Sequence, residues 1–323
     1  MTSTSNDDDA IVERAKKIPK TLKRRYRMVA LDLDGTLLST KRTVANVQAE
    51  YLRGLSEKGF HVCIATGRAA TGTYDHAAKL QIPKLPVVCS NGSRGFFWSP
   101  SSSISDGNED DNDNSAPMIE ELFHHQVPKE VVQRAIRMAN QHGYCIQYYY
   151  MDSVYANQKN PTHYKCTTMY TDYTGVRIDH IDDDFQELLE KNHLPSKLLL
   201  LFDDKDGTKA RQVANEEFDP TEATIVKGYC SWFMEILNAT SNKGVGLRRM
   251  CHQLEIPLDQ VIAIGDGCND LEFLQMAGLG VAVKNAEPEV KEIADINLDF
   301  TNDDHGPMRI LQELEEKGEL AFQ

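Results

Sequence analysis

The sequence predicts an α/β protein, a doubly wound parallel sheet interrupted by an inserted α+β segment. Apolar strands alternate with amphipathic helices near both ends of the chain. The middle of the chain differs, because it is richer in tyrosine and in strands of alternating polarity. Near-continuous apolar strands are typical of a parallel sheet whose two faces are covered by helices. With 323 residues, the chain is long enough for two domains.

The first third contains three apolar strands, and two helical patterns separate them. The helical patterns have apolar residues at helical spacing, and glycine follows the first of them. In chain order we expect a strand at 26–33, a helix at 43–59, a strand at 60–65, a helix at 69–80 and a strand at 86–90.

The last third repeats this strand and helix alternation. We expect a strand within 261–267, a helix at 269–278, a strand at 279–283 and short helices near 287–294 and 305–317. These outer segments resemble two halves of one sheet, so we favour an insertion over two independent tandem domains.

The expected division of the chain follows from these patterns. The middle has strands near 144–150, 153–157, 197–202 and 231–237, set around helices near 128–142 and 206–217. We expect a flexible tail at 1–24, a core of 25–92 plus 236–323, and an insertion at 93–235. The acidic, low-complexity stretch 99–117 within the insertion is expected to be a disordered loop.

Composition excludes several classes of function. The net charge of −14 and the pI of about 5.2 disfavour binding to nucleic acid or to anionic membranes. No run of about 18 apolar residues is present to span a membrane. The seven cysteines form no C-x-x-C pair and several lie in apolar runs, as reduced thiols do in intracellular proteins. Together with the lack of an apolar signal core near the N-terminus, this predicts a cytoplasmic protein.

Polar residues follow four of the expected strands, in the segments "DLDGT", "ATGR", "SNG" and "GDGCND". In open α/β sheets, ligands bind at the carboxyl ends of the strands. Asp32 and Asp34 can face one crevice because they are two residues apart in an extended segment. Asp266 and Asp270 share a helical face because they are four residues apart.

Each segment also has a simpler explanation when it is taken alone. "GDG" and "TGR" could be ordinary turns at strand ends. A calcium-binding loop is excluded at residue 32, because positions 36 and 43 are threonines where that loop requires a ligand and a glutamate. The four segments together favour a common site.

Four carboxylates converging on one crevice would repel one another, and that repulsion raises pKa values. A hard divalent cation relieves the repulsion. Oxygen donors without a His/Cys cluster select Mg²⁺ over Zn²⁺. The sequence therefore contains the residue set that phosphoryl transfer requires.

These motifs resemble the haloacid dehalogenase-like hydrolase superfamily, and specifically the Cof-type phosphatases with a large type-two cap. The resemblance rests on "DLDGT" at 32–36, Thr66 in "ATGR", Lys243 in "SNKGVGL" and "GDGCND" at 265–270. The later stretch "GLGVAVKNAEPEVKEIAD" is also similar to that family. The resemblance implies a Rossmann-like core, with the insertion as a cap domain.

The resemblance also implies roles for the carboxylates. Asp32 would be the nucleophile that forms an aspartyl-phosphate, and Asp34 the general acid and base. Asp32, the backbone carbonyl of Asp34, and Asp266 would bind Mg²⁺. Asp270 would support this metal site through water or through neighbouring side chains.

Further residues are implied in binding the phosphate and the substrate. Thr66 and Lys243 would hold the phosphoryl oxygens, Gly67 could add a backbone N–H, and Asn269 could orient Lys243 or the phosphate. Arg68, Asn91 and Gly92 resemble family positions near the substrate, although they could simply fix loops. Taken alone, Lys243 could also be a surface lysine near a helix start.

The expected function is a Mg²⁺-dependent phosphomonoester hydrolase acting on a small phosphorylated metabolite, such as a sugar phosphate. One alternative is a phosphomutase of the phosphomannomutase type, which shares D-x-D-G-T and a similar cap but returns the phosphate to its product. Another alternative is a non-catalytic binding or regulatory protein on this scaffold. The presence of both Asp32 and Asp34 disfavours it. The sequence fixes neither the substrate nor the oligomeric state.

Overall fold

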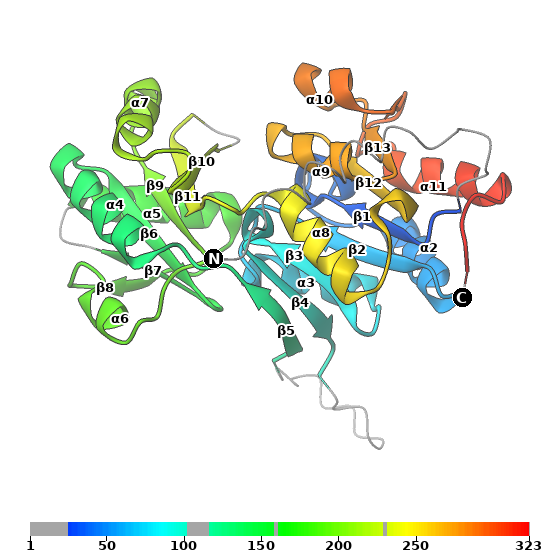
Figure 1. Ribbon diagram of the computed structural model, residues 1–323, viewed down its shortest axis with the longest axis horizontal. Coiled ribbons are helices and arrows are strands. Elements are labelled where there is room, and N and C mark those ends of the chain that lie inside the picture. Colours follow the sequence, from blue (N-terminus) through cyan, green and yellow to red (C-terminus); the bar gives the residue numbers. More distant parts are fainter. Residues whose placement is uncertain (1–24, 102–115, 158–160, 229–230, 323) are drawn as a thin grey trace, which may run out of the picture.

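The structure, a computed structural model, describes residues 25–101, 116–157, 161–228 and 231–322. The tail expected at 1–24, and most of the loop expected at 99–117, lie outside these residues. Figure 1 shows two units, each built on its own sheet with helices packed against it.

The larger sheet joins the two ends of the chain. Its eight strands lie in the order β14-β13-β12-β1-β2-β3-β4-β5. All neighbours from β14 to β3 are parallel, and β1 pairs with β12 from Met28↔Val261 to Leu31↔Ile264. The strands are β1 (Met28–Leu31), β2 (His61–Ala65), β3 (Leu85–Cys89), β4 (Arg94–Ser99), β5 (Met118–His124), β12 (Val261–Gly265), β13 (Leu279–Ala282) and β14 (Ile296–Asn297). The expected parallel core made from both ends of the chain is confirmed.

Two groups of helices cover this sheet. α2 (Asn46–Glu57) packs on α3 (Thr71–Leu80) and on α11 (Gly306–Glu316), while α9 (Leu271–Met276) packs on α8 (Lys243–Gln253) and on α10 (Pro288–Ile293). The crossovers β1–α2–β2 and β12–α9–β13 proceed in opposite directions from the middle of the sheet. Right-handed crossovers in opposite directions place their helices on opposite faces. The reversal between β1 and β12 is therefore the switch point at which such sheets bind ligands.

The smaller sheet is mostly antiparallel and has the order β10-β11-β9-β6-β7-β8. Its strands are β6 (Cys145–Tyr150), β7 (Ser153–Asn157), β8 (Asp179–Ile181), β9 (Lys197–Leu201), β10 (Ala223–Lys227) and β11 (Phe233–Asn238). Its helices are α4 (Lys129–His142), α5 (Pro161–Thr174), α6 (Gln186–Glu190) and α7 (Gly207–Glu217). This is the expected α+β insertion.

The two faces of the smaller sheet pack against different partners. Leu198 and Leu200 of β9 belong to the apolar cluster with α4 and α7, whereas Leu199 and Leu201 pack with α5 residues such as Tyr170. The second cluster also includes Ala69, which follows β2 of the larger sheet. Alternation along a strand thus directs one face of this sheet toward the larger unit.

The hairpin of β4 and β5 differs from the expected domain division. Residues 93–124 lie within the range 93–235 that is expected for the insertion, but β4 pairs antiparallel with β3 and β5 with β4. The hairpin therefore extends the edge of the larger sheet. An antiparallel hairpin can extend the edge of either sheet, so the sequence does not reveal which sheet it joins.

Within the described parts of the chain, no helix has the length and apolar character needed to cross a membrane.

Candidate active site

The segment after β1 turns sharply beneath the loop that follows β12. The backbone N–H of Asp32 donates to Ile264 O at 3.0 Å, which continues the β1–β12 pairing to the end of the strand. Gly35 has φ of 77°, and a Cβ there would lie 2.2 Å from Asp266 Oδ2. Only glycine satisfies both the left-handed backbone and this close approach.

Three buried carboxylates meet at this turn. Asp32, Asp266 and Asp270 each offer an oxygen within 4.8 Å of the others. Lys243 Nζ lies 2.5 Å from Asp32 Oδ1 and 2.6 Å from Asp270 Oδ1. The interpretation of Lys243 as a surface lysine is wrong, because it is only 1% exposed. It is the first residue of α8, where Asn242 caps the helix by accepting from the Val245 N–H.

Local hydrogen bonds fix the other two carboxylates. Asp270 Oδ2 accepts the backbone N–H groups of Asp266 and Gly267, each at 3.0 Å. Thr36 Oγ1 donates to Asp266 Oδ1 at 2.6 Å. Asp270 therefore supports Asp266 through its backbone, and Thr36 holds the Asp266 side chain directly.

Charge is unbalanced in this group, which contains three carboxylates and one ammonium. Burial, and next the charge of Asp270, raise the pKa of Asp266 to about 7. Burial also raises the pKa of Asp32; Lys243 lowers it, and Asp270 and Asp266 raise it further. A divalent cation would remove the repulsion, and carboxylate oxygens are ligands that Mg²⁺ accepts. The donor set thus fits Mg²⁺.

Asp34 lies apart from these carboxylates, against Arg68. Arg68 donates to it in a bidentate arrangement, at 2.7 Å from Nε and 2.6 Å from Nη2. Although burial acts to raise the pKa of Asp34, the hydrogen bonds and charge of Arg68 outweigh it, and the pKa is lowered. His76 lies 3.1 Å from Arg68 Nη1, and burial followed by the charge of Arg68 lowers the pKa of His76. The neutral ring can therefore accept from Arg68.

The loops after β2 and β3 are bound to each other. Asn91 has φ of 50°, and its N–H donates to Thr66 O at 3.1 Å. Thr66 Oγ1 accepts the Arg68 N–H at 3.2 Å. Asn269 Nδ2 donates to Asn91 Oδ1 at 2.9 Å, so the described bond of Asn269 goes to Asn91 and not to Lys243. Thr66 and Asn269, two of the four expected phosphate-binding residues, thus belong to one connected network, whereas Lys243 bonds to Asp32 and Asp270.

Two charged residues of the smaller sheet join this network and were not predicted. Lys197 Nζ donates to Gly67 O at 2.9 Å, and Glu235 Oε2 accepts from Asn91 Nδ2 at 2.7 Å. A charged residue inside an apolar strand, as in "SKLLLLF" and "WFMEIL", is the signal that could have identified them.

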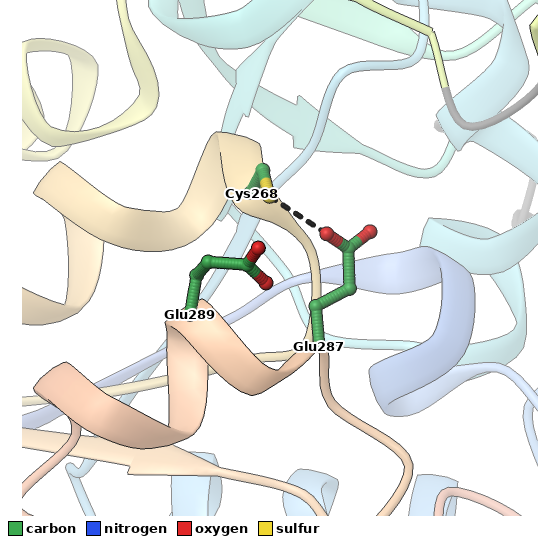
Figure 2. Close-up of side chains that lie close together, drawn as sticks. All are labelled: Cys268, Glu287 and Glu289. Carbon is green, nitrogen blue, oxygen red and sulfur yellow. Dashed lines mark hydrogen bonds between the residues drawn. The ribbon is translucent and has the colours of Figure 1, made fainter.

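A second group of potential metal ligands lies beside motif "GDGCND" and consists of Cys268, Glu287 and Glu289 (Figure 2). Cys268 and Glu289 are exposed, and Cys268 Sγ donates to Glu287 Oε2 at 2.7 Å. Burial and the neighbouring Glu287 raise the pKa of the Cys268 thiol to about 11. The thiol already donates to Glu287, and two of the three side chains are exposed, so we assign the group no ligand role.

A Rossmann-like core with an inserted cap, and aspartates at the end of its first strand, define the class of the cap-bearing haloacid dehalogenase-like hydrolases. The sequence model of the haloacid dehalogenase-like hydrolase family matches residues 29–95 and 116–311. The chain belongs to this family. The expectation of an enzyme of the phosphatase class is confirmed at the level of the family.

Individual relatives agree along nearly the whole chain. The 5-amino-6-(5-phospho-D-ribitylamino)uracil phosphatase YitU of Bacillus subtilis is 27% identical over 88% of this chain and 96% of its own length. Phosphatase YwpJ of the same organism is 26% identical, over 89% and 99%. A haloacid dehalogenase-like hydrolase from Bacteroides thetaiotaomicron has a similar structure, with a TM-score of 0.72 at 22% identity, over 90% of this chain and 100% of that one. This last likeness concerns the fold alone.

Proposed function

We propose that this protein is a Mg²⁺-dependent phosphomonoester hydrolase that acts on a small phosphorylated metabolite through an aspartyl-phosphate on Asp32. The observation that supports this most is the position of Asp32, which is buried beside Lys243 and two further carboxylates. A charged cluster of this kind is costly to bury unless a metal and an anionic substrate complete it.

The metal would be held by Asp32, the backbone carbonyl of Asp34, and Asp266, with Asp270 as their support. Bound there, Mg²⁺ would neutralise charge on the phosphoryl oxygens. Lys243 and Thr66 would contact the same oxygens, and Gly67 would add its N–H. Repulsion between a carboxylate and a phosphate dianion is the main barrier to attack, so these cationic and donor groups favour the transition state.

The first step transfers the phosphoryl group to the enzyme. A carboxylate oxygen of Asp32 attacks phosphorus, the bond from phosphorus to the leaving oxygen breaks, and Asp34 gives a proton to that oxygen. Arg68 favours the ionised form of Asp34 in the free protein. The approach of a phosphate dianion raises the pKa of a nearby carboxyl group, which favours the protonated form when the substrate arrives.

The second step returns the enzyme to its starting state. Asp34, now ionised, takes a proton from a water molecule, and the resulting hydroxide attacks the phosphorus of the aspartyl-phosphate. The bond from phosphorus to Asp32 breaks and orthophosphate leaves. Arg68 acts in favour of this step, because it stabilises the carboxylate form that the general base requires.

In this proposal the catalytic residues belong to the unit built on the larger sheet, and the unit built on the smaller sheet is the cap. The cap would follow β5 and end before α8, rather than begin at residue 93. It would exclude water and contact the leaving group. The YitU relative is named a phosphatase of 5-amino-6-(5-phospho-D-ribitylamino)uracil, and this name supports a small phosphorylated substrate for this chain as well.

Phosphate release from para-nitrophenyl phosphate tests the proposal. We expect Mg²⁺-dependent activity in the wild type and at least a thousandfold lower kcat in Asp32→Asn, because the amide is a poor nucleophile. The matched control is the thermal unfolding midpoint in EDTA, which should not fall, because the variant removes one charge from the cluster and its amide oxygen can still accept from Lys243. Equal kcat in the variant would refute Asp32 as the nucleophile. Conversion of sugar 1-phosphate to sugar 6-phosphate without phosphate release would indicate the phosphomutase instead.

A further inference from the structure

Two oppositely charged side chains of the cap are buried on the face that turns toward the core. Lys197 of β9 is 1% exposed and Glu235 of β11 is 6% exposed. Glu235 pairs with Leu199 in the antiparallel register, and Lys197 lies two residues before Leu199. Alternation therefore places both charges on the face of Leu199 and Leu201, which packs with Ala69 of the core.

The pair is connected to itself and to two core loops. Lys197 Nζ lies 2.5 Å from Glu235 Oε1. The same ammonium donates to Gly67 O, and the other carboxylate oxygen accepts from Asn91 Nδ2. The ring of Tyr149 lies 4.7 Å from Lys197 Nζ. Every polar contact that this pair makes outside the cap is therefore made to the loops after β2 and β3, within the described residues.

Stability alone is a weak reason to bury such a pair. Burying an ion pair costs about as much in desolvation as its attraction returns, and apolar replacements are often as stable. The contacts to Gly67 and Asn91 offer a different reason, because they fix the orientation of groups in the proposed phosphate site. A carboxylate can only accept hydrogen bonds, so Glu235 forces Asn91 to present Nδ2 to the cap and Oδ1 to Asn269.

Lys197 has a parallel effect on Thr66. Its ammonium holds the carbonyl of the peptide between Gly67 and Arg68, and the N–H of that peptide donates to Thr66 Oγ1. A hydroxyl oxygen that already accepts is left with its own hydrogen to donate elsewhere. Under the proposed function, that hydrogen is directed to a phosphoryl oxygen.

We propose that Lys197 and Glu235 form a positioning pair, through which the closed cap orients Thr66, Gly67, Asn91 and Asn269 to bind the phosphoryl group. The inference deepens the proposed hydrolase function and rests on it. An ion pair between neighbouring cap strands stays intact when the cap moves away, whereas its bonds to Gly67 and Asn91 break. The complete phosphate site thus exists only when the cap is closed.

Three variants separate positioning from stability. Lys197→Met and Glu235→Gln each remove one charge, and the double variant Lys197→Met/Glu235→Leu removes the pair without leaving a charge unpaired. The matched control is Arg134→Met, which breaks ion pairs with Glu217 and Glu222 elsewhere in the same cap. For each protein we would measure the thermal unfolding midpoint, the affinity for orthovanadate with Mg²⁺, and kcat and KM for para-nitrophenyl phosphate.

We expect both single variants to bind orthovanadate at least tenfold more weakly and to have a higher KM, since each loses a charge-assisted hydrogen bond. The double variant should have the unfolding midpoint of the wild type, because it leaves no buried charge unpaired, but it should not recover the wild-type affinity for orthovanadate. Arg134→Met should keep both affinity and KM. A double variant that binds orthovanadate as tightly as the wild type would overturn the inference. If the orthovanadate affinities of the variants followed this pattern but the wild type released no phosphate, the proposed hydrolase function would be contradicted. The positioning of the phosphate-binding residues by the cap pair would still be supported.

Discussion

The core cluster and the cap pair are both buried groups of charges, and their charge balance differs. The core cluster of Asp32, Asp266 and Asp270 has only Lys243 to oppose it, so two negative charges remain if all three carboxylates ionise. In the cap pair, Lys197 and Glu235 cancel. Glu235 of the cap pair is linked through Asn91 to Asn269, the residue that precedes Asp270 of the core cluster.

This difference in charge balance shows which group needs a further ion or proton. A pair of opposite charges is neutral without a further ion, and its remaining donors and acceptors can form hydrogen bonds with neighbouring loops. An unbalanced cluster requires protons or a cation, as the raised pKa of Asp266 indicates. In the proposed function, the core cluster is therefore the metal and reaction site, and the cap pair positions the residues around it.

Removing the single cation of the core cluster should have the largest effect. Without metal, Lys243→Met leaves Asp32 and Asp270 unpaired and should lower the free energy of unfolding by about 3–5 kcal/mol. Chemical denaturation in EDTA measures this loss, and added Mg²⁺ should restore part of it. Lys197→Met is the comparison, and its loss should be smaller. If both variants lost the same free energy of unfolding, the proposed contrast between the core cluster and the cap pair would be wrong.

The affinity for Mg²⁺ should depend on pH through Asp266. A carboxyl group with a folded pKa of about 7 contributes stability at low pH, and this contribution is lost as the pH rises from about 4 to 7. Mg²⁺ must displace that proton, so its affinity should fall about tenfold per pH unit below 7, or about a hundredfold at pH 5. Calorimetric titration between pH 5 and 8 measures the slope. An affinity independent of pH would exclude Asp266 as the titrating ligand.

Neutralising one carboxylate should stabilise the metal-free protein while removing its activity. Asp266→Asn keeps an oxygen that can accept from Thr36 but removes a charge from the cluster. We expect the free energy of unfolding in EDTA to rise by about 1–2 kcal/mol and the stabilisation by Mg²⁺ to disappear. Thermal unfolding with and without Mg²⁺ checks both. A variant that Mg²⁺ still stabilises as strongly as the wild type would refute this ligand assignment.

The smallest effect is expected at Asp34, which is paired with Arg68 outside the core cluster. Arg68→Met should raise the pKa of Asp34, because burial then acts without the opposing hydrogen bonds and charge. A general acid with a higher pKa stays protonated to higher pH, so the alkaline limb of the plot of kcat/KM against pH should shift to higher pH. The displacement is limited because half of the Asp34 side chain is exposed to solvent. If the alkaline limb did not shift, Arg68 would not control the protonation of Asp34.

Several of the site residues that the sequence could predict share one property. Asp32, Asp34, Thr66 and Asp266 each follow an apolar strand, and parallel strands of one sheet bring such positions to a common edge. Strand patterns and short motifs therefore predicted both the fold class and which segments converge. The convergence of Asp32 with Asp266 and Asp270 is what the structure describes.

Other features depended on contacts that no local pattern carries. The β4–β5 hairpin joins the edge of the larger sheet, although its own pattern suits either sheet. The burial of Lys243 follows from its two carboxylate partners, which are 27 and 211 residues away in sequence. The roles of Lys197 and Glu235 arise only where the two sheets meet.

The α/β core, the inserted unit and the acidic residues at the strand ends could be predicted from the sequence, because hydrophobic periodicity and short motifs are local properties. Which charges balance and which do not depends on contacts that form only in the folded chain. Electrostatic energies depend on distance and burial, so the pairing of Asp34 with Arg68, and of Lys197 with Glu235, exists only in the folded chain.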